Sequence, residues 1–161
     1  MSRNDIFFDS SALIAGIVST QGAARALLLL AEDKKILITV SEQVIAEVER
    51  NIARKAPKAV RFARELILHA NIQILRDPQV EEVHQRQDWI SHAADVPILV
   101  AAVLARVDFL ATLNTKHYID DPEVSCSSGL CIGRPGDALA WVRKQLSKAS
   151  LQRRKSTFLP D

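Results

Sequence analysis

The sequence is poor in the features that mark several special classes of protein. It holds two cysteines, five glycines and 5% aromatic residues in a chain of 161 residues. Two cysteines are too few for a disulfide scaffold, and five glycines exclude a collagen-like repeat. The apolar run at 23–31 is interrupted by Arg25 and is far shorter than the roughly 20 residues that cross a bilayer. The chain should therefore fold as an ordinary compact domain.

The start of the chain does not resemble a secretory signal, because charged residues occur within the first five positions and no long apolar segment follows. We therefore expect a cytoplasmic protein whose cysteines, Cys126 and Cys131, stay reduced. The pair could hold zinc only if histidines from elsewhere in the chain joined it. Neither a Walker loop nor a G-x-G-x-x-G turn is present, which disfavours nucleotide-binding folds.

Short apolar segments rich in Ile, Val, Phe and Thr alternate with longer segments of helical periodicity. The short segments, which we predict to be strands, are 6–8, 36–40, 72–75, 109–112 and 130–132. The helical segments are 11–31, 44–52, 97–105 and 138–146, and Pro57 predicts a break in the helical region between 45 and 70. The alternation predicts an α/β protein, a three-layer α/β/α domain with a mainly parallel central sheet of about five strands. We assign residues 1–146 to this domain and 147–161 to a flexible basic C-terminal tail.

Acidic residues follow or precede the predicted elements at positions where chemistry is expected. In open parallel sheets, ligands bind beyond the carboxyl ends of the strands. Asp9 directly follows the first predicted strand, where its carboxylate is either a helix N-cap or a metal ligand. Asp95 precedes the apolar helix at 97–105, where the same two roles are open. Thr112 and Asn114, at the end of the fourth strand, offer uncharged oxygen atoms.

Glu47 is a third acidic candidate, on one flank of the helix at 44–52. Glu42 and Glu49 lie on the other flank at a similar angular distance from the apolar face. Periodicity alone therefore does not choose among the three glutamates.

Four segments, in this order and spacing, resemble the PIN domain family. They are FDSSALI at 8–14, VSEQVIAEV at 40–48, DVPILVAA at 95–102 and DFLATLNTKHY at 108–118. The segment LCIGRPGDAL at 130–139 is similar to the last strand and the start of the C-terminal helix of the family. The resemblance spans residues 6 to about 146.

The resemblance implies a metal-dependent ribonuclease, as in bacterial toxins of the VapC type and in RNA-processing nucleases. It selects Glu47 over its neighbours and implies that three carboxylates hold Mg²⁺ or Mn²⁺, those of Asp9, Glu47 and Asp95. Asn114 falls where many members carry a fourth aspartate and is expected to assist catalysis. Ser11 and Thr112 match polar positions that support the acidic residues.

The residue types fit this chemistry, because hard divalent cations prefer oxygen ligands. A bound ion supplies an activated water and neutralises charge at the phosphate. With three carboxylates, the site should hold one ion firmly and a second only weakly unless RNA contributes phosphate oxygens. Asp120 or Asp121 would replace the missing fourth charge only if the loop folded back. We expect His92 and His117 to be surface or supporting groups.

The net charge of +2 conceals a separation of charge along the chain. Residues 50–64 carry six cationic residues and no acidic one. Four cations recur there at helical spacing, interrupted only by Pro57, and these are Arg50, Arg54, Lys58 and Arg61. The stripe is either an RNA-backbone contact or an ordinary solvated face.

The favoured function is a metal-dependent endoribonuclease that hydrolyses RNA phosphodiesters, as the toxin of a toxin-antitoxin pair. RNA, a cognate antitoxin protein and a second copy in a homodimer are the expected partners. The alternative is a catalytically weak or inactive PIN fold that binds RNA or protein. A phosphohydrolase of the haloacid dehalogenase type is disfavoured, because Ser11 stands where that motif needs a second aspartate.

Overall fold

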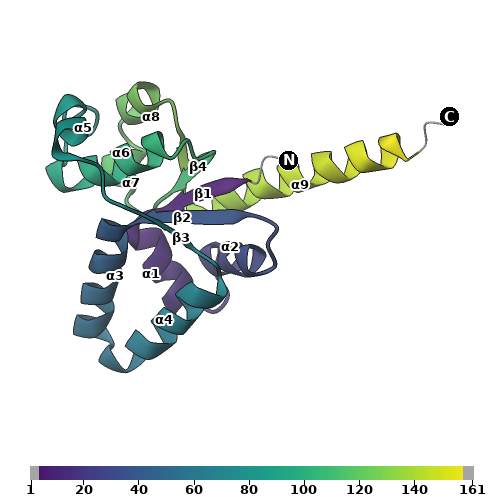
Figure 1. The fold of residues 1–161 in the computed structure, drawn as a ribbon, viewed down its shortest axis with the longest axis horizontal. Helices are drawn as coiled ribbons and strands as arrows, with labels where there is room; N and C mark the ends of the chain where they lie inside the picture. Colours follow the sequence, from purple (N-terminus) through teal and green to yellow (C-terminus); the bar gives the residue numbers. More distant parts are fainter. Residues whose placement is uncertain (1–3, 158–161) are drawn as a thin grey trace.

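The computed structural model describes residues 4–157 and contains a five-stranded, fully parallel sheet. The strand order is β3-β2-β1-β4-β5. The strands are β1 (Asp5–Phe8), β2 (Leu37–Ser41), β3 (Gln73–Leu75), β4 (Phe109–Ala111) and β5 (Cys131–Gly133). Figure 1 shows helices on both faces of the sheet, so the predicted α/β/α class is confirmed.

Burial explains which strands are central. Ile6, Phe7 and Phe8 of β1 are fully buried, and β4 is buried along its whole length. A strand covered on both faces reads as a continuous apolar run, which is how 6–8 and 109–112 stand out in the sequence. The edge strand β3 is more polar, and its Ile74 is half exposed.

Helices α1 to α4 lie on one face of the sheet, and α5, α6 and α8 lie on the other (Figure 1). Their bounds are α1 (Ser10–Val18), α2 (Ala23–Glu32), α3 (Glu42–Lys55), α4 (Val60–His69), α5 (Val80–Gln85), α6 (Val96–Leu104), α7 (Thr115–Tyr118) and α8 (Pro122–Ser128). The short 3-10 turns η1 (Pro57–Ala59) and η2 (Ala93–Asp95) precede α4 and α6. The break predicted at Pro57 is confirmed, because α3 ends at Lys55 and α4 begins at Val60.

The predicted helical segment 11–31 is not one helix. It is divided at residues 19–22 into α1 and α2, which meet at 87°. Arg25 stabilises the corner, because its Nε donates to the carbonyl of Gly16 and its Nη2 donates to that of Ile17 at 2.8 Å. A cation at these carbonyls offsets the negative end of the α1 dipole.

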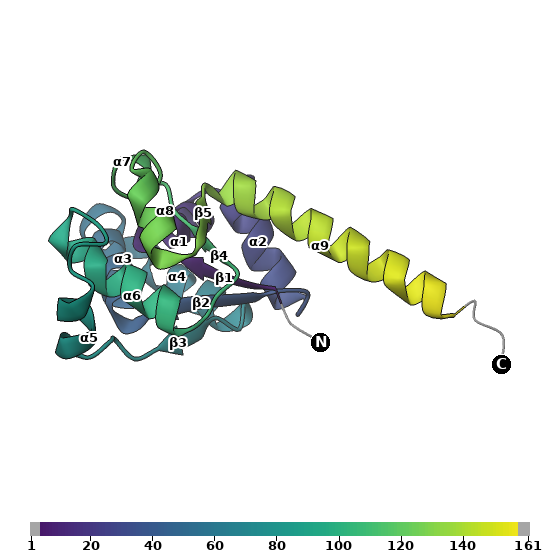
Figure 2. The same ribbon diagram turned by 90° about the horizontal axis from the view of Figure 1, so that it is seen from above.

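The last helix, α9 (Pro135–Ser156), starts against the sheet and then leaves it. Ala138 and Val142 are buried, whereas residues 150–157 are exposed. Figures 1 and 2 show the C-terminal half of α9 projecting beyond the rest of the protein. The predicted tail is therefore helical over 147–156, and its residues 158–161 lie outside the described part. The domain boundary at residue 146 stays a prediction.

No single helix among residues 4–157 is both long and apolar enough to span a membrane, and α1 and α2 meet that test only as a bent pair. Cys126 and Cys131 are free thiols exposed on α8 and β5.

Gly16 permits the close crossing of α1 and α2. A Cβ atom at Gly16 would lie 2.6 Å from Leu28 Cδ1 and 3.4 Å from the Ala24 backbone, whereas one at Gly136 would meet nothing within 4 Å. We predict that Gly16→Val lowers the free energy of unfolding by about 1–3 kcal/mol through overpacking. The same change at Gly136 should alter it by less than about 0.5 kcal/mol. Urea denaturation of both variants measures the difference, and equal stabilities would contradict this account of the crossing.

Candidate active site

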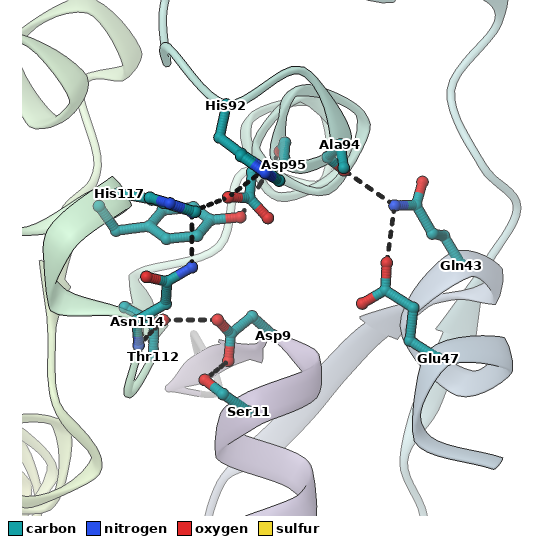
Figure 3. A network of polar contacts seen from close by, with 11 residues as sticks. Asp9, Ser11, Gln43, Glu47, His92, Ala94, Asp95, Thr112, Asn114 and His117 are labelled. Atoms are coloured by element: carbon teal, nitrogen blue, oxygen red, sulfur yellow. Dashed lines mark hydrogen bonds and ion pairs between the residues drawn. The ribbon is translucent and has the colours of Figure 1, made fainter. Parts of the chain in front are cut away.

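The carboxyl ends of β1, β2 and β4 form one edge of the sheet, and the predicted site residues gather there. Asp9 follows β1, α3 begins directly after β2, and Thr112 follows β4. Because β1 lies between β2 and β4, Asp9 is at the centre of this edge. Figure 3 shows the side chains of Asp9, Glu47 and Asp95 around a common space, with Asn114 at its side.

Asp9 is a buried carboxylate, 4% exposed, held by three hydrogen bonds. Its Oδ1 accepts from Ser11 Oγ at 2.7 Å and from the Ala12 amide at 2.9 Å, and its Oδ2 accepts from Thr112 Oγ1. The side chain is thus the N-cap of α1 and still retains acceptor capacity on Oδ2, since a carboxylate offers about four acceptor positions. The N-cap and ligand interpretations of Asp9 are therefore compatible.

Two hydroxyl groups connect Asp9 with the turn after β4. Ser11 Oγ accepts from the Leu113 amide at 2.9 Å, and Thr112 Oγ1 accepts from the Asn114 amide at 2.9 Å. Each hydroxyl accepts from the turn and donates to the carboxylate. The contacts suit the supporting role that the family resemblance implies for Ser11 and Thr112.

Burial raises the pKa of Asp9, and the nearby negative charge of Asp95 adds to this effect. The hydrogen bonds from Thr112, Ser11 and Ala12 oppose the rise. The ionised form of Asp9 is consequently costly in the folded protein.

Hydrogen bonds and ion pairs distinguish the three glutamates of α3. Glu42 accepts from the amide of Asp77 at 3.2 Å, and Glu49 pairs with Arg64 at 3.4 Å. Glu47 instead accepts from Gln43 Nε2 at 3.0 Å. Figure 3 shows it on the side of α3 that faces Asp9.

Gln43 is a site residue that sequence reasoning missed. Its Nε2 also donates to the carbonyl of Ala94 at 3.0 Å, next to Asp95, and so it joins α3 to the turn η2. Its position four residues before Glu47 on the same helix is the signal that could have identified it.

Asp95 lies at the start of α6 but its side chain makes no capping hydrogen bond. Its Oδ2 is 2.7 Å from His117 Nδ1 and 3.3 Å from His92 Nδ1. Figure 3 shows its other oxygen turned toward the space shared with Asp9 and Glu47. The geometry therefore favours the second of the two roles that the sequence left open for Asp95.

His117 contacts two residues of the site through Nδ1. A carboxylate only accepts, so Nδ1 of His117 carries the proton that it donates to Asp95. Asn114 Nδ2 is placed 2.8 Å from the same atom, and this contact is favourable only if the amide is turned so that its oxygen accepts. His117 is thus a supporting group, as expected, and it joins Asn114 to Asp95.

The cluster of His92, Asp95 and His117 brings three potential metal-ligating atoms within 4.8 Å of one another. However, the two imidazole rings are stacked, with centroids 4.3 Å apart and an angle of 17° between their planes. The lone pair of an imidazole lies in its ring plane, so two stacked rings cannot both direct one at the same ion. In this arrangement at most one of the two imidazoles could join Asp95 at an ion, and both lie beside Oδ2 of Asp95.

The site carries negative charge without a lysine or arginine partner. Among the described residues, no lysine or arginine forms an ion pair with Asp9, Glu47 or Asp95. Burial raises the pKa of Tyr118 well above its ordinary value, and all three carboxylates contribute to this rise. The three charges therefore act on one region, and their oxygen atoms are suitable ligands for a hard divalent cation.

Neither aspartate of the following loop joins these groups. Asp121 caps α8 by accepting from the Glu123 amide at 3.0 Å, and Asp120 is exposed. Replacement of the missing fourth charge by this loop is therefore not observed.

The predicted cationic stripe is exposed but does not lie along one helix. Arg50 and Arg54 are on α3, Lys58 is in η1, and Arg61 is on α4. Arg61 pairs with Glu65 at 3.0 Å, which offsets part of its charge.

Comparison with known proteins agrees with this architecture. The family model of the PIN domain matches residues 5–116. No curated protein sequence matches the chain.

Three solved structures are similar in fold. VapBC2 from Rickettsia felis, bound to a DNA fragment from its promoter, gives a TM-score of 0.59 at 18% identity over 81% of this chain and 98% of that one. PAE2754 from Pyrobaculum aerophilum gives 0.59 at 18% identity over 87% and 90%. VapC20 from Mycobacterium tuberculosis, a toxin that cleaves the sarcin-ricin loop, gives 0.52 at 16% identity over 76% and 94%. With a family model matched over most of its length, the chain belongs to the PIN domain family.

Proposed function

We propose that this protein is an endoribonuclease that hydrolyses RNA phosphodiesters with Mg²⁺ or Mn²⁺ held by Asp9, Glu47 and Asp95. The observation that carries the proposal is the convergence of three carboxylates at the carboxyl ends of the strands, where none of them pairs with a lysine or arginine of residues 4–157. Family membership supports a nuclease over other metal-dependent activities.

The ligand set fits a divalent cation, which on binding would supply an activated water and neutralise charge at the phosphate. The protein groups fix its surroundings in advance. Three hydrogen bonds hold Asp9, Gln43 ties Glu47 to the carbonyl of Ala94, and His117 holds one oxygen of Asp95. Such preorganisation lowers the cost of arranging charge during the reaction. Asn114 lies at the same edge and would assist through its amide.

The biological setting that we propose is the toxin of a toxin-antitoxin pair. The Rickettsia felis structure is a VapBC2 complex and the Mycobacterium tuberculosis structure is an RNA-cleaving toxin, and both share this fold. An antitoxin protein, a homodimer and a cytoplasmic location belong to this proposal. The competing proposal, a PIN fold that binds RNA or protein without cutting, is favoured only by the absence of charge at Asn114.

The two glutamates Glu47 and Glu49 provide a matched test. Glu47→Gln removes a proposed metal ligand, and we expect it to reduce cleavage of single-stranded RNA with Mn²⁺ by at least about 100-fold. Glu49→Gln removes the same charge from the same helix but loses only an exposed ion pair, so its activity should change by less than about twofold. Equal cleavage by the two variants and the wild type would show that Glu47 is not a metal ligand. Absence of cleavage by the wild type would favour the non-cutting alternative.

Asp9→Asn should lose activity yet gain stability when no metal is present. The raised pKa of Asp9 means that its ionised form destabilises the folded protein at neutral pH, and asparagine removes that charge. An increase of about 1 kcal/mol in the free energy of unfolding raises the Tm by roughly 2–4 °C. The gain should fall as the pH drops through the raised pKa of Asp9. It should vanish only below the ordinary pKa of an aspartate, where Asp9 is neutral in both the folded and the unfolded protein.

Thermal unfolding with and without MgCl₂ completes this test. Mg²⁺ should raise the Tm of the wild type and leave that of Asp9→Asn nearly unchanged, because the ion stabilises only the form that binds it. A Tm of Asp9→Asn that rises equally with Mg²⁺ would show that Asp9 is not a ligand.

The number of metal ions depends on Asn114. With three carboxylates, one Mn²⁺ should bind tightly to the wild type without nucleic acid, and Asn114→Asp should add a second tight site. Isothermal titration with MnCl₂ counts the sites. Two tight sites in the wild type would contradict the prediction.

A further inference from the structure

A groove lies at the amino ends of the strands, at the opposite end of the sheet from the candidate active site. It has a volume of about 890 Å³ and is bounded on one side by the projecting helix α9. The other side is formed by Asn4 before β1, Lys34 and Lys35 before β2, and Asp108 before β4. Since all strands are parallel, these residues and the candidate active site lie at opposite ends of the strands.

The groove is cationic. Lys148 and Arg153 of α9 line it together with Lys34 and Lys35, and Asp108 is the only acidic residue among the described residues that line it. The carboxylate of Asp108 is already engaged, because its Oδ2 accepts from the Asp5 amide at 2.9 Å. No described acidic side chain forms an ion pair with any of the four cations.

The distal part of α9 extends this charge. Between residues 147 and 157, four cations and no acidic residue occur, and they are Lys148, Arg153, Arg154 and Lys155. The helix leaves the rest of the protein here, so its sides are open to a partner (Figure 2).

The shape and charge of the groove suit a polyanion. Leu151 is the one large apolar side chain of the described distal helix, 147–157, that is mostly exposed, so the surface has little to offer an apolar protein interface. A second copy of α9 would bring like charges together. The part-buried Trp141, whose ring lies 6.1 Å from that of Phe109, is a rigid aromatic surface inside the groove.

We propose that this groove, which we call the α9 groove, binds the phosphate backbone of RNA at a distance from the site of cleavage. The α9 groove and the candidate active site lie at opposite ends of the strands, and a strand of the length of β1 spans roughly 13 Å. An RNA that contacts both sites must therefore extend along the outside of the domain. The inference rests on the proposed function and adds that a structured RNA long enough to reach both sites binds more tightly than a short single strand.

The test measures binding of a labelled hairpin RNA in EDTA, where no cleavage occurs, as a function of salt concentration. Lys148→Gln/Arg153→Gln removes two cations while keeping good helix formers. The slope of log K against log salt should become shallower by about 1.5, as expected for the loss of two phosphate contacts. Arg143→Gln is the control on the same helix, because Arg143 does not line the groove, and its slope should match that of the wild type.

Four results would overturn the inference. The first is an unchanged salt slope in the double variant, and the second is a control whose slope falls as much as that of the double variant. The third is that polyglutamate displaces the labelled hairpin as well as unlabelled hairpin RNA does. The fourth is a double variant with a changed oligomeric state and unaltered RNA binding. Circular dichroism of each variant checks that its total helix content equals that of the wild type.

Cleavage then separates this inference from the proposed function. With Mn²⁺, the double variant should raise the KM for the hairpin several-fold and leave cleavage of a short single strand unchanged. If the wild type binds through the groove but cuts neither RNA, the proposed function fails and the groove remains. If Glu47 is needed for cutting while the double variant behaves as the wild type with both RNAs, the groove proposal fails alone.

Discussion

The buried carboxylate of Asp9 is the constraint on which the rest of the site depends. A charge that is 4% exposed costs free energy, and the protein offsets part of that cost with two hydroxyl groups and one backbone amide. Ser11 and Thr112 serve Asp9 and at the same time fix the turn after β4. The hydroxyl of Thr112 that donates to Asp9 also accepts from the Asn114 amide, so the hydrogen bonds of Asp9 help to fix the position of Asn114.

The fold was readable from the sequence because its central strands are buried on both faces. All five strands were predicted within about two residues, since runs such as Ile6–Phe8 have no polar interruption. The corner between α1 and α2 was missed. An apolar face continues through both helices, and the corner depends on the fit of Gly16 against Leu28, which no local pattern reveals. The helix α9 was foreseen only as far as its apolar periodicity extends, because its remaining turns contact no core.

The site was less accessible to sequence reasoning. Asp9 and Asp95 could be nominated from their places beside strands and helices, but Glu47 could be chosen over Glu49 only through family resemblance. The structure gives a physical reason for that choice, since Glu49 is engaged by Arg64 and Glu47 by Gln43. Gln43 contacts Ala94 across 51 residues of chain and His117 contacts Asp95 across 22, and contacts at such separations leave no local signature. Only the spacing of Gln43 and Glu47 on one helix was visible in the sequence.

The hydrogen bond between Asp9 and Thr112 joins residues 103 positions apart, and β1 pairs with β4 over a similar separation. Contacts this distant in sequence form slowly, and they cannot form on a ribosome before the second partner has been made. The N-terminal strand β1 is central in the sheet, but it can pair with β4 only after most of the domain has been synthesised. A growing chain of this protein therefore carries its acidic residues for most of its synthesis without the arrangement that would let them act together.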